Sequence, residues 1–193
     1  MKFRSTLFAT YGSEAEAFGM ILVYNGGMDL SEFQDLPDEA RVWVHCFEQE
    51  LSEQQQEIIL KGLQEFLPQW DSHGTPVKAV FKILSGRFVV TAAYSQEEIS
   101  GCSTDSFLRN FKTFKTVYGL DGLKGGLLFY RDAEGTIQAV DQLKFQDLME
   151  SGEITSETQI FQTLLSSLGQ LRSGEFEAPF EKSWLSRTFS LPT

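Results

Sequence analysis

The stretch Val77-Lys-Ala-Val-Phe-Lys-Ile-Leu-Ser-Gly-Arg-Phe-Val-Val-Thr-Ala-Ala-Tyr94 decides the fold, because it predicts two strands joined by a tight turn. Residues 77–84 and 87–94 are rich in β-branched, aromatic and other apolar side chains, which favour strands. Ser85-Gly86 lies between them and is typical of a two-residue hairpin turn. We therefore expect an antiparallel hairpin near the centre of the chain.

A strand and a helix are predicted before this hairpin. The segment Arg41-Val-Trp-Val-His-Cys-Phe47 alternates apolar with polar side chains and is rich in strand formers. Ser52 and Gln55 have the spacing of a capping box, and Pro68 marks the end of the helix that this box opens. One face of the helix is apolar, which indicates packing on a sheet; it carries Ile59, Leu63, Phe66, Leu67 and Trp70.

A second helix and two more strands are predicted after the hairpin. The helix carries one aromatic stripe, which is typical of a buried face: Phe107, Phe111, Phe114 and Tyr118. Gly119 fits the position just after the helix end, where glycine adopts a left-handed conformation. Residues 126–130 and 135–140 then predict two strands joined by a turn at Asp132-Ala-Glu-Gly135.

The order β-α-β-β-α-β is the split βαβ pattern of ferredoxin-like domains. We therefore predict an α+β fold with a ferredoxin-like core, an antiparallel sheet, and both helices on one face because crossovers are right-handed. The core is expected to cover residues 28–135. Residues 136–193 are expected to form a small strand-helix-strand extension packed on the core, with a helix at 143–151 and a strand at 158–163.

Residues 1–27 differ from the rest of the chain. A weak apolar run, Phe18 to Tyr24, ends at the turn signal Asn25-Gly26-Gly27, and Met28 follows at once. Two interpretations stay open. Residues 1–27 are an optional arm or a misassigned start upstream of Met28, or residues 17–24 form an N-terminal strand added to a sheet edge.

The composition excludes several classes of function. The chain of 193 residues holds 27 Asp and Glu against 16 Lys and Arg, which gives a net charge of −11. Nucleic-acid binding needs a clustered basic footprint, and anionic lipid surfaces also attract basic segments. No segment approaches the roughly 20 consecutive apolar residues that span a bilayer. We therefore expect no nucleic-acid partner and no membrane insertion. Only two cysteines, Cys46 and Cys102, are present, which indicates a reducing compartment, and we expect the cytoplasm.

Nucleotide and metal motifs are missing from the sequence. A P-loop needs Gly-x-x-x-x-Gly-Lys followed by Ser or Thr, and the glycines of Gly122-Leu-Lys-Gly125-Gly126 have a different spacing. His45 and Cys46 are neighbours on a predicted strand, so their side chains point to opposite faces and do not converge on one metal ion. We expect no P-loop ATPase activity, no metal and no cofactor.

One loop carries residues suited to catalysis or ligand binding, Ser100-Gly-Cys-Ser-Thr-Asp-Ser106. It precedes a strong helix, so free backbone N–H groups and the positive end of the helix dipole favour an anion or a thiolate. The candidate ligand-binding residues are Ser100, Gly101, Cys102, Ser103 and Thr104. Cys102 is the candidate nucleophile and His73 its candidate base. The opposing interpretation, which we favour, is an ordinary helix cap with a structural Cys102 thiol buried beneath the helix.

Several short motifs resemble a family of small bacterial cytosolic proteins that often carry the label "ABC transporter ATPase". They are Phe33-x-x-Leu-Pro-Asp-Glu-Ala-Arg-Val-Trp43, Trp70-x-x-His73-Gly74, Ser100-Gly-Cys-Ser103 and Ser183-Trp184. The resemblance covers roughly residues 30–190. It implies a bacterial cytosolic protein that starts at Met28, and it implies no catalytic residues. The ATPase label is unsupported in this chain, which lacks a P-loop.

The C-terminal part is similar to bacterial GYF-like modules, which act in contacts between proteins. The similarity covers about 50 residues and rests on Tyr130, Gly135, Phe145-x-x-Leu148, Gly152-x-Ile154-Thr155 and Thr158-x-Ile160-Phe161. Leu128-Phe129-Tyr130 stands where such a module usually opens with an aromatic pair.

These observations favour a non-enzymatic binding or adaptor module for a protein or a small anionic ligand. The alternatives are a cysteine-dependent enzyme that uses Cys102 with His73, and a ferredoxin-like regulator that binds a small ligand. An exposed apolar groove within residues 128–180 would favour the binding module. A reactive Cys102 would favour the enzyme.

Overall fold

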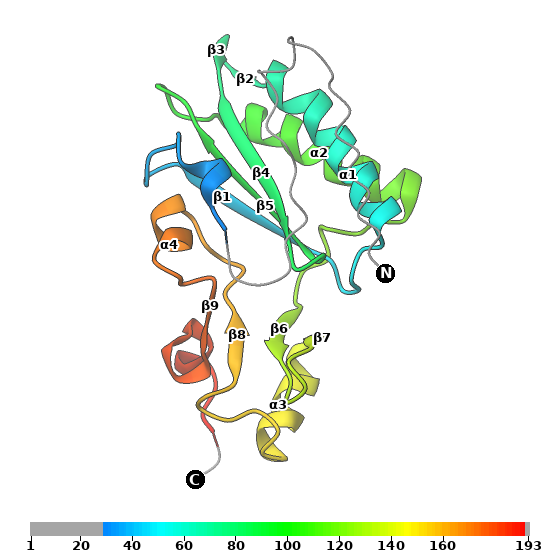
Figure 1. Ribbon diagram of the computed structural model, residues 1–193, viewed down its shortest axis with the longest axis vertical. Coiled ribbons are helices and arrows are strands. Elements are labelled where there is room, and N and C mark those ends of the chain that lie inside the picture. The colour runs from blue at the N-terminus through cyan, green and yellow to red at the C-terminus, as the bar shows by residue number, and fades with distance from the viewer. Residues whose placement is uncertain (1–28, 192–193) are drawn as a thin grey trace, which may run out of the picture.

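The computed structural model describes residues 29–191 (Figure 1), so both interpretations of residues 1–27 concern a segment outside the described residues. The fold is α+β, as predicted, with three antiparallel sheets. Four α-helices occur in the described part of the chain: α1 (Glu53–Phe66), α2 (Gly101–Tyr118), α3 (Gln142–Glu150) and α4 (Leu168–Arg172). Within residues 29–191, no helix has the length and apolar character needed to cross a membrane.

The central hairpin forms as its sequence predicts. Strands β4 (Lys78–Leu84) and β5 (Phe88–Tyr94) pair in register from Lys78 opposite Tyr94 to Leu84 opposite Phe88. Ser85 and Gly86 have φ angles of 50° and 59°, in the left-handed region, and the N–H of Arg87 donates to the Leu84 carbonyl at 3.0 Å. The turn holds three residues, Ser85 to Arg87, one more than the sequence predicts. Strand β1 (Arg41–Cys46) pairs with the other side of β5, which gives a three-stranded sheet of order β1-β5-β4.

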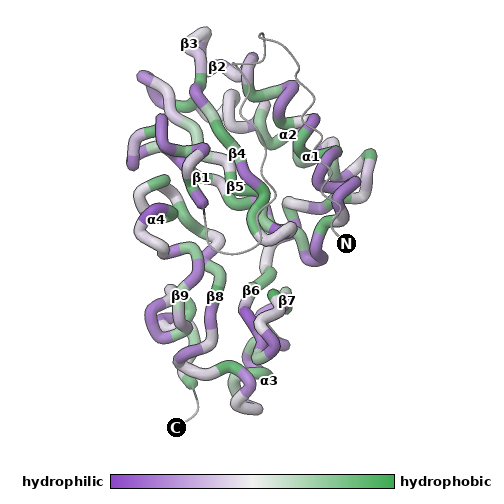
Figure 2. Tube along the Cα trace, in the orientation of Figure 1, coloured by the Kyte–Doolittle hydropathy of each residue, from purple (hydrophilic) through white to green (hydrophobic). Residues whose placement is uncertain are grey.

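Helices α1 and α2 cover one face of this sheet (Figure 1). The predicted capping box opens α1, where the Ser52 side chain accepts from the N–H of Gln55 and the Gln55 side chain accepts from the N–H of Ser52. Phe107 and Phe111 of α2 are fully buried, and Phe114 nearly so. Tyr118 is 51% exposed, because Gly119 turns the chain and Leu120 enters the core instead. Figure 2 shows hydrophilic and hydrophobic residues alternating along both helices.

A second sheet lies against the opposite side of the first. Its order is β7-β6-β8-β9, built from β6 (Leu128–Arg131), β7 (Ile137–Val140), β8 (Gln159–Phe161) and β9 (Glu177–Pro179). Helix α3 packs on it through Phe145, Leu148 and Met149. The predicted boundary at residues 135 and 136 falls in the turn of the β6–β7 hairpin. A small hairpin, β2 (Asp71–Ser72) with β3 (Thr75–Pro76), forms the third sheet.

The ferredoxin-like order is not confirmed. The order β1-β5-β4 contains the first three strands of that pattern, but the predicted fourth strand, β6, pairs with β7 and β8 instead of β1. The reason is packing: Phe129 of β6 meets Phe88 of β5 edge to face, with ring centroids 5.1 Å apart. Strand β6 therefore packs against the face of the first sheet and does not pair with the edge of β1.

The first sheet is buried on both faces. Phe88, Val90 and Val42 point away from the helices into a cluster with Phe129 and Phe161 of the second sheet. Lys82 points to the same face, where its Nζ lies 2.8 Å from Glu32 Oε2 and donates to the Asp29 carbonyl at 2.7 Å. These two bonds hold the start of the described chain over β4.

Candidate functional site

The predicted loop at residues 100–106 is the start of α2. Ser100 is the N-cap, and its Oγ accepts from the N–H of Ser103 at 3.2 Å. The helix begins at Gly101, so Cys102 lies in the first turn. Thr104 Oγ1 donates back to the Ser100 carbonyl at 3.0 Å. Three of the five candidate ligand-binding residues, Ser100, Ser103 and Thr104, therefore already form hydrogen bonds with one another in the first turn of the helix.

The β2–β3 turn, which carries His73, lies against this helix start. Ser103 Oγ donates to the Asp71 carbonyl at 2.7 Å, and the N–H of Ser100 donates to Ser72 Oγ at 3.0 Å. Trp70 adds a bond from its Nε1 to the Ser103 carbonyl at 3.1 Å. The structure thus brings the two predicted segments together through buried serines rather than through Cys102 and His73.

Cys102 and His73 are both exposed. No hydrogen bond joins them within the part of the chain that the structure describes. His73 occupies the turn with a φ of 55°, in the left-handed region. The expectation of a buried Cys102 thiol is wrong, because Ser103, the next residue, takes the position facing the β2–β3 hairpin.

His45 and Cys46 lie on opposite faces of β1, as expected from strand geometry. The His45 ring stacks on Phe111 of α2, with centroids 3.5 Å apart and an angle of 11° between planes. Burial lowers the pKa of His45 to about 3. Cys46 points to the other face, where burial raises the pKa of its thiol to about 12. Among residues 29–191, no group of three or more His, Cys, Asp or Glu side chains is arranged to hold a metal ion.

The outer edge of β1 is paired along only part of its length. The N–H of Phe47 donates to the Arg87 carbonyl at 3.0 Å, on the β5 side. Hydrogen-bonded and non-bonded pairs alternate in an antiparallel ladder, so the backbone groups of Val42, Val44 and Cys46 point outward. The N–H of Val42 finds the Ser166 carbonyl at 3.2 Å. The N–H groups of Val44 and Cys46 have no hydrogen-bond partner in residues 29–191.

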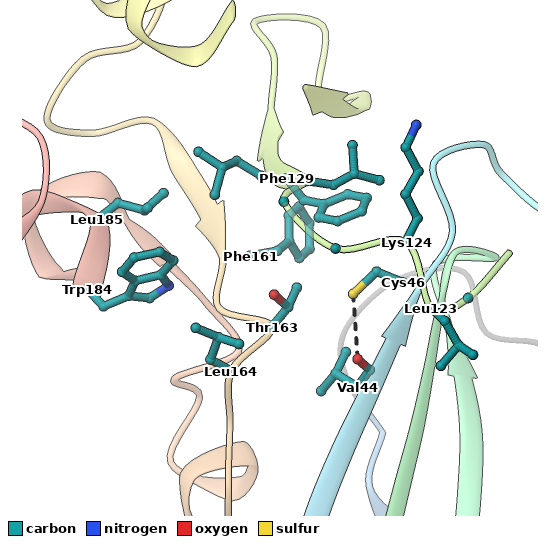
Figure 3. A pocket seen from close by; sticks show the side chains of 15 residues that line it. Val44, Cys46, Leu123, Lys124, Phe129, Phe161, Thr163, Leu164, Trp184 and Leu185 are labelled. Carbon is teal, nitrogen blue, oxygen red and sulfur yellow. Dashed lines mark hydrogen bonds between the residues drawn. The ribbon is translucent and has the colours of Figure 1, made fainter. Parts of the chain in front are cut away.

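An apolar groove opens beside these two residues (Figure 3). Its volume is about 320 Å³, and its wall comes from four separate parts of the chain: β1, residues 122–129 at the start of β6, residues 161–164 at the end of β8, and the C-terminal segment at 184–185. The side chains that line it include Val44, Cys46, Leu123, Phe129, Phe161, Thr163, Leu164, Trp184 and Leu185. Figure 3 shows Val44 and Cys46 facing Phe161 and Thr163 across the opening.

Two features of the groove favour an apolar occupant. Leu164 is 74% exposed and Leu123 is 36% exposed, and both lie on its rim. The Cys46 thiol is neutral at physiological pH and donates to the Val44 carbonyl at 3.8 Å, so the wall carries no charge there. Lys124, the charged lining residue, forms an ion pair with Glu48.

The glycine-rich stretch at 122–126 has a structural role in this groove. A Cβ atom at Gly122 would lie 2.7 Å from Cζ of the Phe47 ring, so glycine allows the loop to pass close to the sheet. Sequence reasoning identified these glycines only as a turn. It did not find the groove, because the lining residues are separated by up to 141 positions and no local pattern relates them.

Comparisons of the chain with protein-family models, with curated proteins and with solved structures find no match.

Proposed function

We propose that this protein is a binding module that holds an extended, apolar segment of a partner protein along the outer edge of β1. The observation that carries this proposal is the combination of the N–H groups of Val44 and Cys46, which have no partner in residues 29–191, with an apolar groove of about 320 Å³ beside them. An exposed strand edge pairs readily with another extended chain. Backbone hydrogen bonds then give affinity, and side chains entering a pocket give selectivity.

The fold supports this position for a partner strand. In the ferredoxin-like pattern the last strand pairs with the free edge of the first. Here β6 lies elsewhere, and residues 166–168 pair with this edge only at residues 40–42. A bound segment would supply the fourth strand and complete a ferredoxin-like sheet. The similarity of the C-terminal part to GYF-like modules, which act in protein contacts, supports the same class of function.

Charge indicates the chemistry of the partner. The net charge of −11 attracts segments with basic residues flanking an apolar centre, and it repels acidic ones. A cytosolic partner is consistent with both cysteines being free thiols.

A peptide titration tests the proposal. The probe is the acetylated and amidated peptide Lys-Thr-Val-Thr-Leu-Thr-Val-Lys, and backbone amide NMR shifts of the full-length protein are the readout. We expect the largest shifts at Val44 and Cys46, and none with a version of the peptide that is N-methylated and therefore cannot pair with a strand. Leu164→Asp should abolish binding because it places a charge on the rim. Leu143→Asp is the matched control, since Leu143 is also 74% exposed but lies on α3. The absence of shifts at Val44 and Cys46 in this titration would contradict the proposal.

A cysteine-dependent enzyme is the second candidate, favoured by one observation. Cys102 is exposed in the first turn of α2, next to the hairpin that carries His73. In a Cys46→Ser background, we expect iodoacetamide to react with Cys102 at pH 7 about as fast as with free glutathione. If Cys102 instead reacts more than about tenfold faster than glutathione, and His73→Ala abolishes this acceleration, the cysteine-dependent enzyme becomes the favoured function.

A further inference from the structure

We propose that residues 163–165 form a strap with two registers, an open one seen in this structure and a closed one in which Leu164 pairs with Val44 along the outer edge of β1. The inference rests on the proposed function, because the closed strap occupies the edge that a partner strand would use. It concerns regulation: a partner binds only while the strap is open.

The strap is held at both ends and is unpaired between them. At one end, the side chain of Gln162 accepts from the N–H of Trp184 at 3.2 Å. At the other end, the carbonyl of Ser166 accepts from the N–H of Val42 at 3.2 Å. Within the described chain, no backbone N–H or carbonyl of residues 163–165 has a hydrogen-bond partner. These three residues can therefore change conformation without breaking a backbone hydrogen bond.

The pairing at the end of the strap sets the register of the closed state. The bond between Val42 and Ser166 belongs to a short stretch in which the chain runs antiparallel to β1. Two residues further along the same register, Leu164 comes opposite Val44. Hydrogen-bonded pairs recur at every second residue of an antiparallel ladder, so Leu164 would accept from the N–H of Val44 and donate to its carbonyl. The strap thus carries the complementary backbone groups at the required position.

The side chains along the strap change phase, which explains why it is open. Phe161 and Leu165 are buried in the cluster between the two larger sheets, and Thr163 lines the groove between them. Leu168 is buried in the same cluster, three positions after Leu165, so the alternation of a strand shifts by one residue there. Leu164 points outward and is 74% exposed. The irregular step has the character of a β-bulge, placed after Leu165.

Closure moves this irregular step along the chain and exchanges one leucine for another. A shift of one residue reverses every side chain of a strand, so Leu164 would turn into the groove and Leu165 would turn to the other side, beside Trp43. Closure buries an exposed leucine and pairs Val44, whereas it exposes a buried leucine. The two apolar contributions are similar in size because both side chains are leucine. A small change at residue 165 should therefore shift the population between the registers.

Amide hydrogen exchange in Leu165→Ala tests the inference on the full-length protein. Alanine removes the side chain that the open strap buries, so we expect the closed strap to gain population and the exchange of the Val44 amide to slow about tenfold. Leu171→Ala is the matched control, since it truncates a buried leucine of the same cluster outside the strap and should not slow Val44. The Phe47 amide, which donates to Arg87, reports that each variant is folded.

A nuclear Overhauser contact identifies the register in the same variant. In the closed strap, residue 165 lies opposite Trp43 as a non-hydrogen-bonded pair with Cα atoms about 4.5 Å apart, so their Hα protons should show a strong contact. Leu165→Val repeats both measurements with a smaller shift, about threefold in the exchange rate, if Leu165→Ala does not fold.

Peptide binding connects the strap to the groove. The affinity for Lys-Thr-Val-Thr-Leu-Thr-Val-Lys should fall about tenfold in Leu165→Ala, because a strap within the same chain competes at a high effective concentration. Leu171→Ala should bind this peptide as the natural sequence does.

The outcomes separate this inference from the proposed function. Val44 exchange that does not slow in a folded Leu165 variant would overturn the strap, and peptide binding by the natural sequence would still support the binding module. Slower exchange that disappears on hundredfold dilution would also overturn it, because Val44 would then pair with a second copy of the chain. Slower exchange with the contact to Trp43, but no peptide binding by the natural sequence, would support the strap and contradict the binding module.

Discussion

His45 shows how one side chain links the sheet to the pH dependence of stability. Its ring lies flat on Phe111, and its Nδ1 has no hydrogen-bond partner among the described residues. Burial penalises the imidazolium and lowers the pKa to about 3, against 6.5 for an exposed histidine. The unfolded chain therefore binds a proton at a pH where the folded chain does not.

This difference predicts that the free energy of unfolding falls as pH is lowered from 6.5. The loss should reach about 2 kcal/mol by pH 5, since each pH unit below the unfolded pKa contributes about 1.4 kcal/mol. Urea titrations at pH 7 and pH 5 measure it. This window lies above the usual range of carboxyl groups, so carboxylates contribute little to the change.

Replacing the ring isolates the effect of His45. In His45→Phe the loss between pH 7 and pH 5 should largely vanish, because an apolar ring cannot bind a proton. His73→Ala is the control: His73 is exposed and the only other histidine, so this variant should keep the full pH dependence. An unchanged loss in His45→Phe would contradict the assignment.

At the scale of single elements, the local signals of the sequence were sufficient. The capping box of α1, the Ser85-Gly86 turn and the Gly119 cap each specify backbone geometry through a few adjacent residues, and all three form, the turn with one residue more than predicted. The fate of β6 was not predictable in this way. Its hairpin with β7 was read correctly, but the choice of a second sheet depends on Phe129 meeting Phe88, a contact between distant residues.

The contact between α1 and α2 gives a prediction at this scale. A Cβ atom at Gly62 would lie 2.7 Å and 2.8 Å from two ring carbons of the buried Phe114. Gly62→Ala should therefore lower the free energy of unfolding by about 1–3 kcal/mol through overpacking, less the roughly 1 kcal/mol that alanine contributes as a better helix former. Thermal unfolding measures the net loss.

Gly101→Ala is the matched control for Gly62→Ala. Gly101 is also helical, but a Cβ atom there meets nothing within 4 Å, so the substitution should be neutral or stabilising. Equal effects of the two substitutions would show that helix propensity, rather than the Phe114 contact, governs Gly62.

For the whole molecule, one aromatic cluster joins the two larger sheets. Phe88 is fully buried, and its ring centroid lies 5.1, 5.0 and 5.3 Å from those of Phe129, Phe161 and Phe176. The same Phe129 and Phe161 line the groove. The groove therefore depends on the junction between the sheets, which is why the sequence, read element by element, predicted the class of fold but not the candidate site.

Phe88→Ala should destabilise the protein by about 3–5 kcal/mol, the usual cost of truncating a buried phenylalanine. Because the cluster serves both sheets, unfolding should stay a single transition. Variants with one tryptophan each check this: Trp70 reports on the helix side of the first sheet and Trp184 on the groove. If Trp70 and Trp184 report different unfolding midpoints in chains that keep Phe88, the two sheets do not unfold together and the proposed role of the cluster is wrong.

The wide spread of the groove residues along the chain has a consequence during synthesis on the ribosome. Leu185 is synthesised 141 residues after Val44, and both line the groove. At a translation rate of about 5–20 residues per second, the edge of β1 waits roughly 7–28 s before its far wall exists. During that interval the outward N–H groups of Val44 and Cys46 are accessible to neighbouring chains on the same messenger RNA, which is a route to aggregation.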